Sequence, residues 1–304
     1  MKFCLCLSPI HRFPRIDDVL RVARQAEEAG FWSIQVPEHL MVRRQDLGPL
    51  HPLMPDPLVL GTAIAMATKR AKVFFNVIVL PYHHPIKLAK ALATLDQVSN
   101  GRVIAGLGVG WLQNEFEALG ANFHRRGAYT HEGIQVMQAL WTQEFATFKG
   151  RFTQFEDMAF EPKPVQKPHI PIWVGGGVRR SLERAAELGD GWHPLSRPWP
   201  QLEAETAEVK RLLKQGGRRV EDFTFSYTAD YGGRDELIKA YAHRSGASDP
   251  IILRDDAEQA SDQIAALERL GFSHLMVRTP AENAGELLRT IDRFHERVMR
   301  PLAG

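Results

Sequence analysis

The amino-acid sequence predicts a closed (β/α)8 TIM barrel with insertion segments, and three observations support this fold class. Short apolar runs alternate with amphipathic stretches from the first residue, and Gly, Pro or Asn marks the breaks. The 304 residues, 44% of them apolar, can bury a full core and suit one large α/β barrel or two ordinary domains. No linker or run of like charges divides the chain, which favours a closed barrel over an open sheet. We therefore expect a single domain over residues 1–304.

The alternation gives eight strand–helix units in chain order. Each predicted strand is a short apolar run, and each predicted helix has apolar residues three and four positions apart. The strands are expected near residues 2–8, 32–37, 71–80, 101–109, 170–175, 189–194, 223–229 and 273–278. The helices are expected near residues 16–29, 57–68, 85–99, 130–143, 178–188, 201–215, 257–270 and 282–298. Residues 230–256 are the part of the chain with the least defined pattern.

One segment interrupts the alternation. Residues 145–160 are rich in aromatic side chains and alternate between apolar and polar residues around Lys149-Gly150. This pattern is typical of a β-hairpin rather than a helix. We expect a hairpin insertion near 145–169.

Charge and cysteine content exclude several classes of partner and location. The 38 basic residues nearly balance the 36 acidic ones, so no broad field favours nucleic acid or an anionic membrane. No apolar run approaches the roughly 18 residues of a membrane span, and no signal peptide is recognisable. Cys4 and Cys6 lie on one face of the first strand and are poorly placed to bridge each other. We expect a cytoplasmic protein that acts on a small-molecule substrate.

A glycine turn between a strand and a helix predicts an anion site. Gly175, Gly176 and Gly177 leave backbone amides uncovered where the helix begins, and the helix dipole favours a phosphate there. The alternative is a tight turn without a ligand. Trp192 and His193 end the next strand and can flank the same ligand, although a core tryptophan with a satisfied N–H explains Trp192 equally well.

Polar residues also follow the second strand and interrupt the third. His39 is the best acid/base candidate, because imidazole gains and loses a proton near neutral pH and the adjacent Glu38 can orient it. A loop histidine with only a structural hydrogen bond is the alternative. Asn76 stands inside an apolar run and needs a ligand or a protein partner. His83 and His84 precede a helix-starting proline and are expected to cap it, not to bind metal.

The fourth strand ends in a glycine motif. Its third glycine comes one residue too early for a dinucleotide fingerprint, and it follows a fourth strand, not a first. Gly108 and Gly110 are instead expected to let a planar ring approach the backbone, with Trp111 as a wall and Asn114 and Glu115 as polar anchors. No metal site is expected. A metallohydrolase barrel would present His-x-His on its first strand, where this chain has Cys4-Leu-Cys6.

Taken together, these motifs resemble the bacterial luciferase-like monooxygenase superfamily, and within it the branch of probable coenzyme F420-dependent oxidoreductases. The resemblance is dense over the first two thirds of the chain and loose over the last third. It rests on the order and spacing of Val36-Pro-Glu-His39, Asp56-Pro-Leu-Val-Leu60, Asn76-Val77, Leu80-Pro-Tyr-His-His-Pro85, Leu92-Ala-Thr-Leu-Asp96, Ser99-Asn-Gly-Arg102, Gly106-Leu-Gly-Val-Gly-Trp111, Asn114-Glu115, Pro162-Lys-Pro-Val-Gln166, Trp173-Val-Gly-Gly176 and Gly189-Asp-Gly-Trp192.

The resemblance implies a bacterial luciferase-like barrel, commonly dimeric, that holds reduced FMN or reduced coenzyme F420 with its ring over the third and fourth strands. Asn76-Val77 matches the family's bulge, which often contains a non-proline cis peptide. Gly175 to Gly177 match the phosphate loop, and His39 matches the histidine beside the reactive edge of the ring. A homodimer and a separate reductase that supplies reduced cofactor are further expected partners.

Two departures from the family pattern keep the choice of cofactor open. Glu38-His39 replaces the Asp-His frequent in deazaflavin users and so favours flavin, whereas Gly127 replaces a tyrosine frequent in flavin monooxygenases and so favours F420. The expected function is two-electron oxidoreduction or monooxygenation of a small organic substrate, with His39 transferring a proton. The alternative is a non-catalytic flavin-binding protein. The loop after the second strand and the hairpin are candidates for a lid or a dimer contact.

Overall fold

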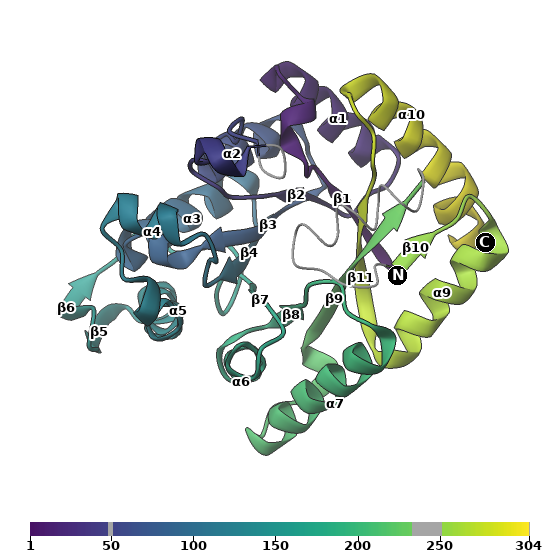
Figure 1. Cartoon of the computed structure of the whole chain (residues 1–304). Helices are drawn as coiled ribbons and strands as arrows, with labels where there is room; N and C mark the ends of the chain where they lie inside the picture. The colour runs from purple at the N-terminus through teal and green to yellow at the C-terminus, as the bar shows by residue number, and fades with distance from the viewer. Residues whose placement is uncertain (48–50, 233–250, 304) are drawn as a thin grey trace.

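The computed structural model describes residues 1–47, 51–232 and 251–303, and its strands form a closed ring of eight (Figure 1). Each neighbouring pair in the ring is parallel, and pairing of β11 with β1 and of β9 with β8 closes it. In ring order the strands are β1 (Lys2–Cys6), β2 (Ser33–Val36), β3 (Lys72–Val79), β4 (Val103–Gly108), β7 (Ile172–Gly175), β8 (Gly191–His193), β9 (Thr224–Tyr231) and β11 (Phe272–Arg278). The predicted (β/α)8 barrel is confirmed.

The helices lie outside this ring (Figure 1). They are α1 (Ile16–Glu28), α2 (Pro57–Ala67), α3 (Pro85–Ser99), α4 (Gln113–Leu119), α5 (Arg126–Thr142), α6 (Arg179–Leu188), α7 (Trp199–Gln215), α9 (Ala257–Leu270), α10 (Ala284–Phe294), the π-helix His295–Met299 and α11 (Arg300–Ala303). Short 3-10 turns cover Ile10–Arg12, Arg44–Asp46, Leu80–Tyr82, Phe123–Arg125 and Val220–Asp222. Across the described ranges, no helix is long and apolar enough to cross a membrane.

Local chemistry explains where several helices begin and end. Asp56 accepts a hydrogen bond from the amide of Val59 at the start of α2, and Asn283 accepts one from Glu286 at the start of α10. Gly271 ends α9 in the left-handed conformation that glycine adopts without a steric penalty. The prediction from the sequence missed α4, which has only seven residues. It also placed the start of α5 too late in the chain, because Gly127 is a weak helix former.

Alternation along the strands separates two cores. Side chains on the outer face of the barrel pack against the helices in one large cluster. The smaller cluster contains Cys4, Cys6, Phe74, Ile104, Trp173 and Met276, which come from five different strands. Both cysteines are buried and free, as expected. The inner cluster fills the barrel, so chemistry is left to the loops at the strand ends.

Two smaller strand features complete the fold. Strands β5 (Phe145–Lys149) and β6 (Gln154–Ala159) form the predicted antiparallel hairpin, which projects from the barrel beside α5 (Figure 1). Strand β10 (Ile251–Leu253) pairs with the end of β9 and was not predicted, because three residues carry too little periodicity. Most of the patternless region 230–256, residues 233–250, lies outside the described residues, and so do residues 48–50 of the expected lid loop.

Candidate functional site

His39 follows β2 and is held by a carboxylate from another loop. Its Nδ1 lies 3.3 Å from Oε2 of Glu115, in the first turn of α4. The expected pairing with Glu38 is wrong. Glu38 instead accepts the amide of Val79 at 2.5 Å and lies 2.7 Å from Nε2 of His83. Residues adjacent on an extended backbone point in opposite directions, so Glu38 and His39 take different partners.

Glu115 is the centre of a buried hydrogen-bond network. It accepts the hydroxyl of Tyr82 at 2.6 Å and the amides of Leu40 and Met41 at 2.6 and 3.2 Å. Burial raises the pKa of Glu115, but the hydrogen bonds from His39, Tyr82 and Leu40 outweigh it and the pKa lies below its ordinary value. Burial, with Glu115 beside it, raises the pKa of Tyr82. Glu115 is therefore a carboxylate anion that accepts a hydrogen bond from the Nδ1–H group of His39. This arrangement leaves Nε2 of His39 for a ligand.

Strand β3 carries the expected bulge. The Asn76-Val77 peptide is cis, and the pairing with β4 shifts register between Phe75 and Ile78. Asn76 has protein partners: its carbonyl accepts Gln35 Nε2 at 2.9 Å, and its Nδ2 lies 3.7 Å from the sulfur of Met276. The bulge therefore connects β3 with β2 and β11 at the carboxyl end of the barrel.

The glycines around the bulge make room for protein side chains. A Cβ on Gly108 would lie 2.5 Å from Cγ2 of Val77, and one on Gly175 would lie 3.0 Å from its Cγ1. A Cβ on Gly110 would meet Val79 at 2.6 Å and Phe116 at 2.9 Å. Packing of protein side chains is thus sufficient to require glycine at positions 108 and 110, and the approach of a planar ring to their backbone stays a prediction. Val77 is wedged between two strands instead.

The predicted phosphate loop links β7 to α6. Gly176 has a φ of +110°, which excludes most side chains, and its amide donates to the carbonyl of His193 at 3.3 Å. A Cβ on Gly177 would collide with the guanidinium of Arg197 and lie 2.8 Å from Glu205 Oε2. Helix α6 has no acidic residue in its first turn. The amide of Ser181 already donates to the carbonyl of Val178 at 2.7 Å. Only the amides ahead of Ser181 at this helix start remain candidates for an anion.

Arg197 and Glu205 form a pair beside this loop that the sequence did not reveal. Arg197 Nε lies 3.4 Å from Glu205 Oε1, and the two side chains are 14% and 10% exposed. Both Arg197 Nε and Glu205 Oε2 are buried without a hydrogen-bond partner. A guanidinium with unused donor capacity next to uncovered helix amides suits a phosphate or carboxylate. An arginine soon after β8 was the only signal in the sequence.

Trp192 and His193 serve the loop and the barrel interior. Trp192 is fully buried, and its indole donates to the carbonyl of Gly176 at 2.7 Å, so it is the core tryptophan that the sequence left as an alternative. His193 lies 2.9 Å from the hydroxyls of both Ser226 and Thr228. Burial lowers the pKa of His193 to about 3, which keeps the imidazole neutral. Neither side chain opens to solvent.

The remaining candidates divide between capping and the site. His84 caps α3 through its Nδ1, which accepts the amide of Ile86 at 3.3 Å, as predicted, whereas His83 pairs with Glu38 and does not cap. Asn114 is half-buried next to Glu115, and its contact with a cofactor stays a prediction. Within the residues described, no three His, Cys, Asp or Glu side chains are grouped to hold a metal ion.

A second charged pair, also missed, joins the ends of β9 and β11. Arg278 donates to both oxygens of Asp230 at 2.6 and 2.8 Å. Burial raises the pKa of Asp230, although Arg278 opposes the effect. Arg12 is buried nearby on β1's loop and donates to the carbonyls of Cys6 and Thr279. These contacts hold the first and last strands together at the carboxyl end of the barrel.

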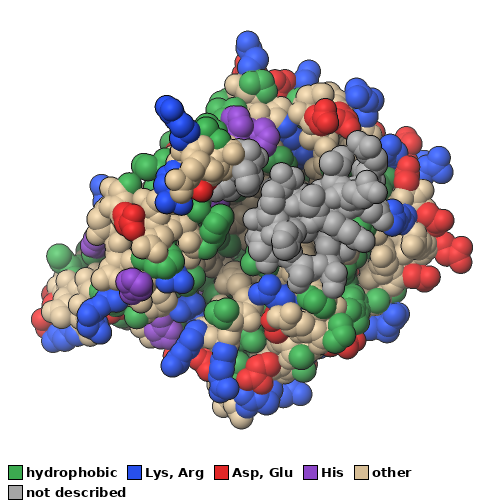
Figure 2. All heavy atoms as spheres, viewed as in Figure 1, with side chains coloured by type: hydrophobic (Ala, Val, Ile, Leu, Met, Phe, Trp, Pro, Cys, Tyr) green, Lys and Arg blue, Asp and Glu red, His purple; other side chains and the backbone are tan. Residues whose placement is uncertain are grey.

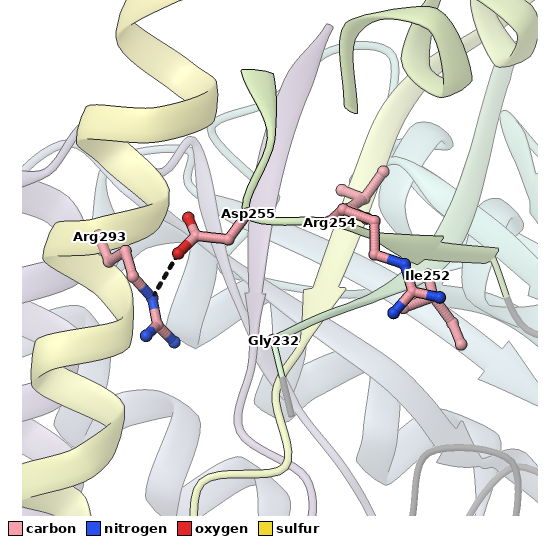
Figure 3. Close-up of a pocket in the computed structure, with 6 residues that line it drawn as sticks. Gly232, Ile252, Arg254, Asp255 and Arg293 are labelled. Atoms are coloured by element: carbon pink, nitrogen blue, oxygen red, sulfur yellow. Dashed lines mark ion pairs between the residues drawn. The ribbon is translucent and has the colours of Figure 1, made fainter. Parts of the chain in front are cut away.

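Two cavities of the described part of the chain lie away from His39. One of about 240 Å³ is lined by Gly232, Ile252, Leu253, Arg254, Asp255 and Arg293 (Figure 3). Arg293 Nε and Asp255 Oδ2 face each other across it at 3.7 Å. A groove of about 620 Å³ lies between α5 and the hairpin and is lined mostly by polar residues. The candidate site is therefore defined by the side chains at the strand ends, not by these cavities.

The chain is similar to several known proteins. The chain matches the family described as Luciferase-like monooxygenase over residues 3–232. An uncharacterised protein of Mycobacterium tuberculosis is 32% identical over 90% of each chain. The F420-dependent glucose-6-phosphate dehydrogenase of Amycolatopsis mediterranei is 29% identical over 94% of each. The FMNH2-dependent dimethylsulfone monooxygenase of Pseudomonas putida is 28% identical over 69% of this chain and 59% of its own length. The crystal structure of monooxygenase RslO1 from Streptomyces bottropensis has a TM-score of 0.79 at 23% identity, covering 99% of this chain and 100% of its own.

Proposed function

Because this chain belongs to the luciferase-like monooxygenase family and is an oxidoreductase, we propose that it binds reduced FMN or reduced F420 at the carboxyl end of the barrel and uses His39 for proton transfer. The observation that carries the proposal is the His39–Glu115 contact of 3.3 Å. An anionic carboxylate on Nδ1 leaves Nε2 as the proton-exchanging atom. The ring of Trp111 lies edge-on to the imidazole of His39, with 5.9 Å between the two ring centroids, and flanks it on one side.

The residues at the mouth fit such a cofactor. The amides that begin α6 and the Arg197 guanidinium, whose Nε has no hydrogen-bond partner, would hold the phosphate. The bulge at Asn76-Val77 would support the ring from behind, with Val77 wedged between Gly108 and Gly175. When bound, the reduced ring supplies the two electrons of the reaction. The protein's own side chains bind and orient the reactants and move the proton.

Those side chains divide the work. His39 would exchange a proton with the substrate through Nε2, while Glu115 stabilises the charged form of the imidazole and anchors the loop through Leu40 and Met41. Tyr82, hydrogen-bonded to Glu115, fixes that carboxylate. We assign Glu38 a positioning role, because its carboxylate joins the end of β3 to His83, whereas His39 pairs with Glu115.

Relatives of two kinds, one named for FMNH2 and one for F420, support either cofactor for this chain. Equilibrium dialysis of the purified protein against each compound tests the choice. Tight binding of one with redox turnover supports the proposal. Binding without turnover would favour the non-catalytic flavin-binding alternative, and binding of neither would refute the proposed function.

The proposal also includes partners and surroundings. A homodimer and a separate reductase follow from the resemblance, and light scattering of the purified protein tests the first. Two buried free thiols, Cys4 and Cys6, agree with a reducing cytoplasm. One barrel domain over residues 1–304, with the hairpin as its insertion, is the simplest organisation for a ring that joins β1 to β11.

A further inference from the structure

Positively charged side chains gather where helices α5 and α6 begin. Arg184 of α6 donates through Nη2 to the carbonyl of Gly127 in the first turn of α5, at 2.9 Å, so the two helix starts are in contact. Figure 2 shows Lys and Arg side chains over the region where Figure 1 places α5 and α6. The arginines concerned, which we call the α5–α6 arginine cluster, are Arg125, Arg126, Arg179, Arg180 and Arg184.

The exposed members of the α5–α6 arginine cluster carry more positive charge than nearby carboxylates neutralise. Arg179 and Arg180 share the single carboxylate of Glu183, at 2.9 and 3.2 Å, and their side chains are 79% and 88% exposed. Arg125 is exposed and forms no ion pair within the described part of the chain. Exposed ion pairs are individually weak, so these guanidinium groups can turn to an added anion.

Arg184 is the member that points most directly to a ligand. It is only 6% exposed, and its Nε is buried without a hydrogen-bond partner. Burial lowers the pKa of Arg184, and Glu187, which itself pairs with His131 at 3.8 Å, opposes this effect only in part. Since a buried cation is costly without an anion beside it, the structure leaves this guanidinium one partner short.

Space for that partner lies beside Gly127. A Cβ on Gly127 would lie 3.5 Å from Arg184 Nη2 and, among the described side chains other than its chain neighbours, would meet nothing else within 4 Å. Arg126, next to this glycine, also has a buried Nε without a partner. Two guanidinium groups with unused donors therefore border one open position, an arrangement that suits a carboxylate.

The α5–α6 arginine cluster adjoins the glycine loop that we assign to the cofactor phosphate. A Cβ on Gly176 would lie 3.1 Å from Oγ of Ser181. Ser181 follows Arg180 in the first turn of α6 and precedes Arg184 by three residues, which is about one helical turn. A flexible chain attached to a phosphate at the loop would therefore reach the arginines over the surface of α6.

We propose that the α5–α6 arginine cluster binds an acidic extension of the cofactor beyond its phosphate, and that this chain therefore takes F420 in preference to FMN. The phosphate of FMN is terminal. The phosphate of F420 continues through lactate into a chain of glutamates, each of which adds a carboxylate. The inference rests on the proposed function, because it requires the phosphate at the glycine loop.

Fluorescence titration of the purified protein, without substrate, compares three compounds: F420 with its glutamate chain, the same deazaflavin ending after lactate, and FMN. We expect the glutamate chain to tighten Kd by about fivefold or more at low ionic strength, and the gain to shrink at about 0.5 M salt. FMN should bind at least about tenfold more weakly than complete F420, because it offers the cluster no carboxylate. Omission of substrate excludes a substrate anion as the source of the effect.

Substitutions on the surface assign the gain to the cluster. Arg125→Gln combined with Arg180→Gln should remove most of the gain from the glutamate chain and change Kd of the truncated deazaflavin by less than about twofold, since both side chains are exposed. Arg184→Met should show the same selectivity. Arg21→Gln combined with Arg219→Gln is the matched control, because it removes two exposed arginines on α1 and ahead of β9, and it should leave the gain intact.

The inference would be overturned by equal affinities for complete and truncated F420, by FMN binding as tightly as complete F420, or by an undiminished gain in the Arg125→Gln, Arg180→Gln protein. Each of these results leaves the proposed function standing, because a cofactor still binds. Binding of neither F420 nor FMN would instead refute the proposed function, and this inference with it.

Discussion

The two sides of the barrel mouth are built in different ways. On the side of β2, β3 and β4, side chains hold one another: His39, Tyr82 and two amides converge on the buried Glu115. On the side of β7 and β8, the backbone forms the site, and glycines admit neighbouring protein groups such as Arg197. The first side suits proton transfer and the second suits holding an anion. Substitutions on the two sides should therefore change different measured quantities.

The largest expected effect is on the proton-transfer side. His39→Ala should lower kcat by about 10²–10⁴-fold, because a positioned acid or base contributes on that order. The cofactor Kd should change by less than about threefold. Steady-state kinetics and fluorescence titration measure the two quantities, and exposed His124→Ala is the control. A parallel loss of kcat and affinity would mean that His39 shapes the cofactor site and transfers no proton.

The anion-holding side should show the opposite pattern. Gly176→Val should weaken cofactor binding by about 100-fold or more, because a β-branched residue does not adopt a φ of +110° and the loop must move. Gly217→Val is the matched control: it has a φ of +70° and open space around its Cβ position, far from the mouth. Similar strain should destabilise both variants, as thermal unfolding will show, while Gly217→Val keeps cofactor affinity. Equal affinity in the two variants would remove the phosphate loop from the site.

Arg197→Met tests the contribution of a single side chain on the anion-holding side. A hydrogen bond to a charged group contributes about 1.5–3 kcal/mol, so cofactor affinity should fall by about 10–100-fold. The single variant also leaves Glu205 buried without its cation. Arg197→Met combined with Glu205→Gln should therefore recover thermal stability and still bind cofactor weakly. Recovery of affinity in the double variant would show that Arg197 only neutralises Glu205.

The smallest effect is expected from Glu115→Gln. Loss of the anion on Nδ1 should lower kcat by about tenfold and move the pH profile, because the charged imidazole loses a stabilising partner. The folded-state pKa of Glu115 lies below its ordinary value, so the ionised carboxylate stabilises the fold above about pH 4.5. That stabilisation is lost as the pH falls through the folded-state pKa. Urea unfolding of both proteins between pH 7 and pH 3.5 should show their difference in free energy shrinking, and a constant difference would contradict the assignment.

The positions of the barrel strands and covering helices could be read from periodicity. The predicted strand near 71–80 and helix near 85–99 correspond to β3 and α3, because apolar spacing reports which face of an element is buried. Strand β10 and helix α4 were missed, since three and seven residues are too few to show a repeating pattern. The hairpin of β5 and β6 was predicted because its alternation surrounds a glycine turn.

The site was predicted less completely than the fold. His39 and the glycine loop stood out, because imidazole titrates near neutral pH and consecutive glycines leave backbone amides uncovered, although each feature also has a purely structural explanation. Glu115 was noted only as a polar anchor. Its pairing with His39 was not predicted, because the two residues lie 76 positions apart in the chain. Arg197 and the Asp230–Arg278 pair were not singled out. A pair of charges on different strands leaves no periodic pattern, so sequence reasoning could not join them.

By itself the sequence determined the eightfold alternation and the turn at Gly175 to Gly177, because periodicity and glycine conformation are local properties. The bulge at Asn76-Val77 was expected only from the resemblance to the family. Only the tertiary structure decided that Glu115, not Glu38, holds His39, and that Val77 fills the space beside Gly108. Closure of the barrel brings the ends of eight strands to one mouth. At this mouth, side chains form hydrogen bonds with residues that are close in space but distant in the chain. Side chains of adjacent residues point in opposite directions, because the backbone there is extended.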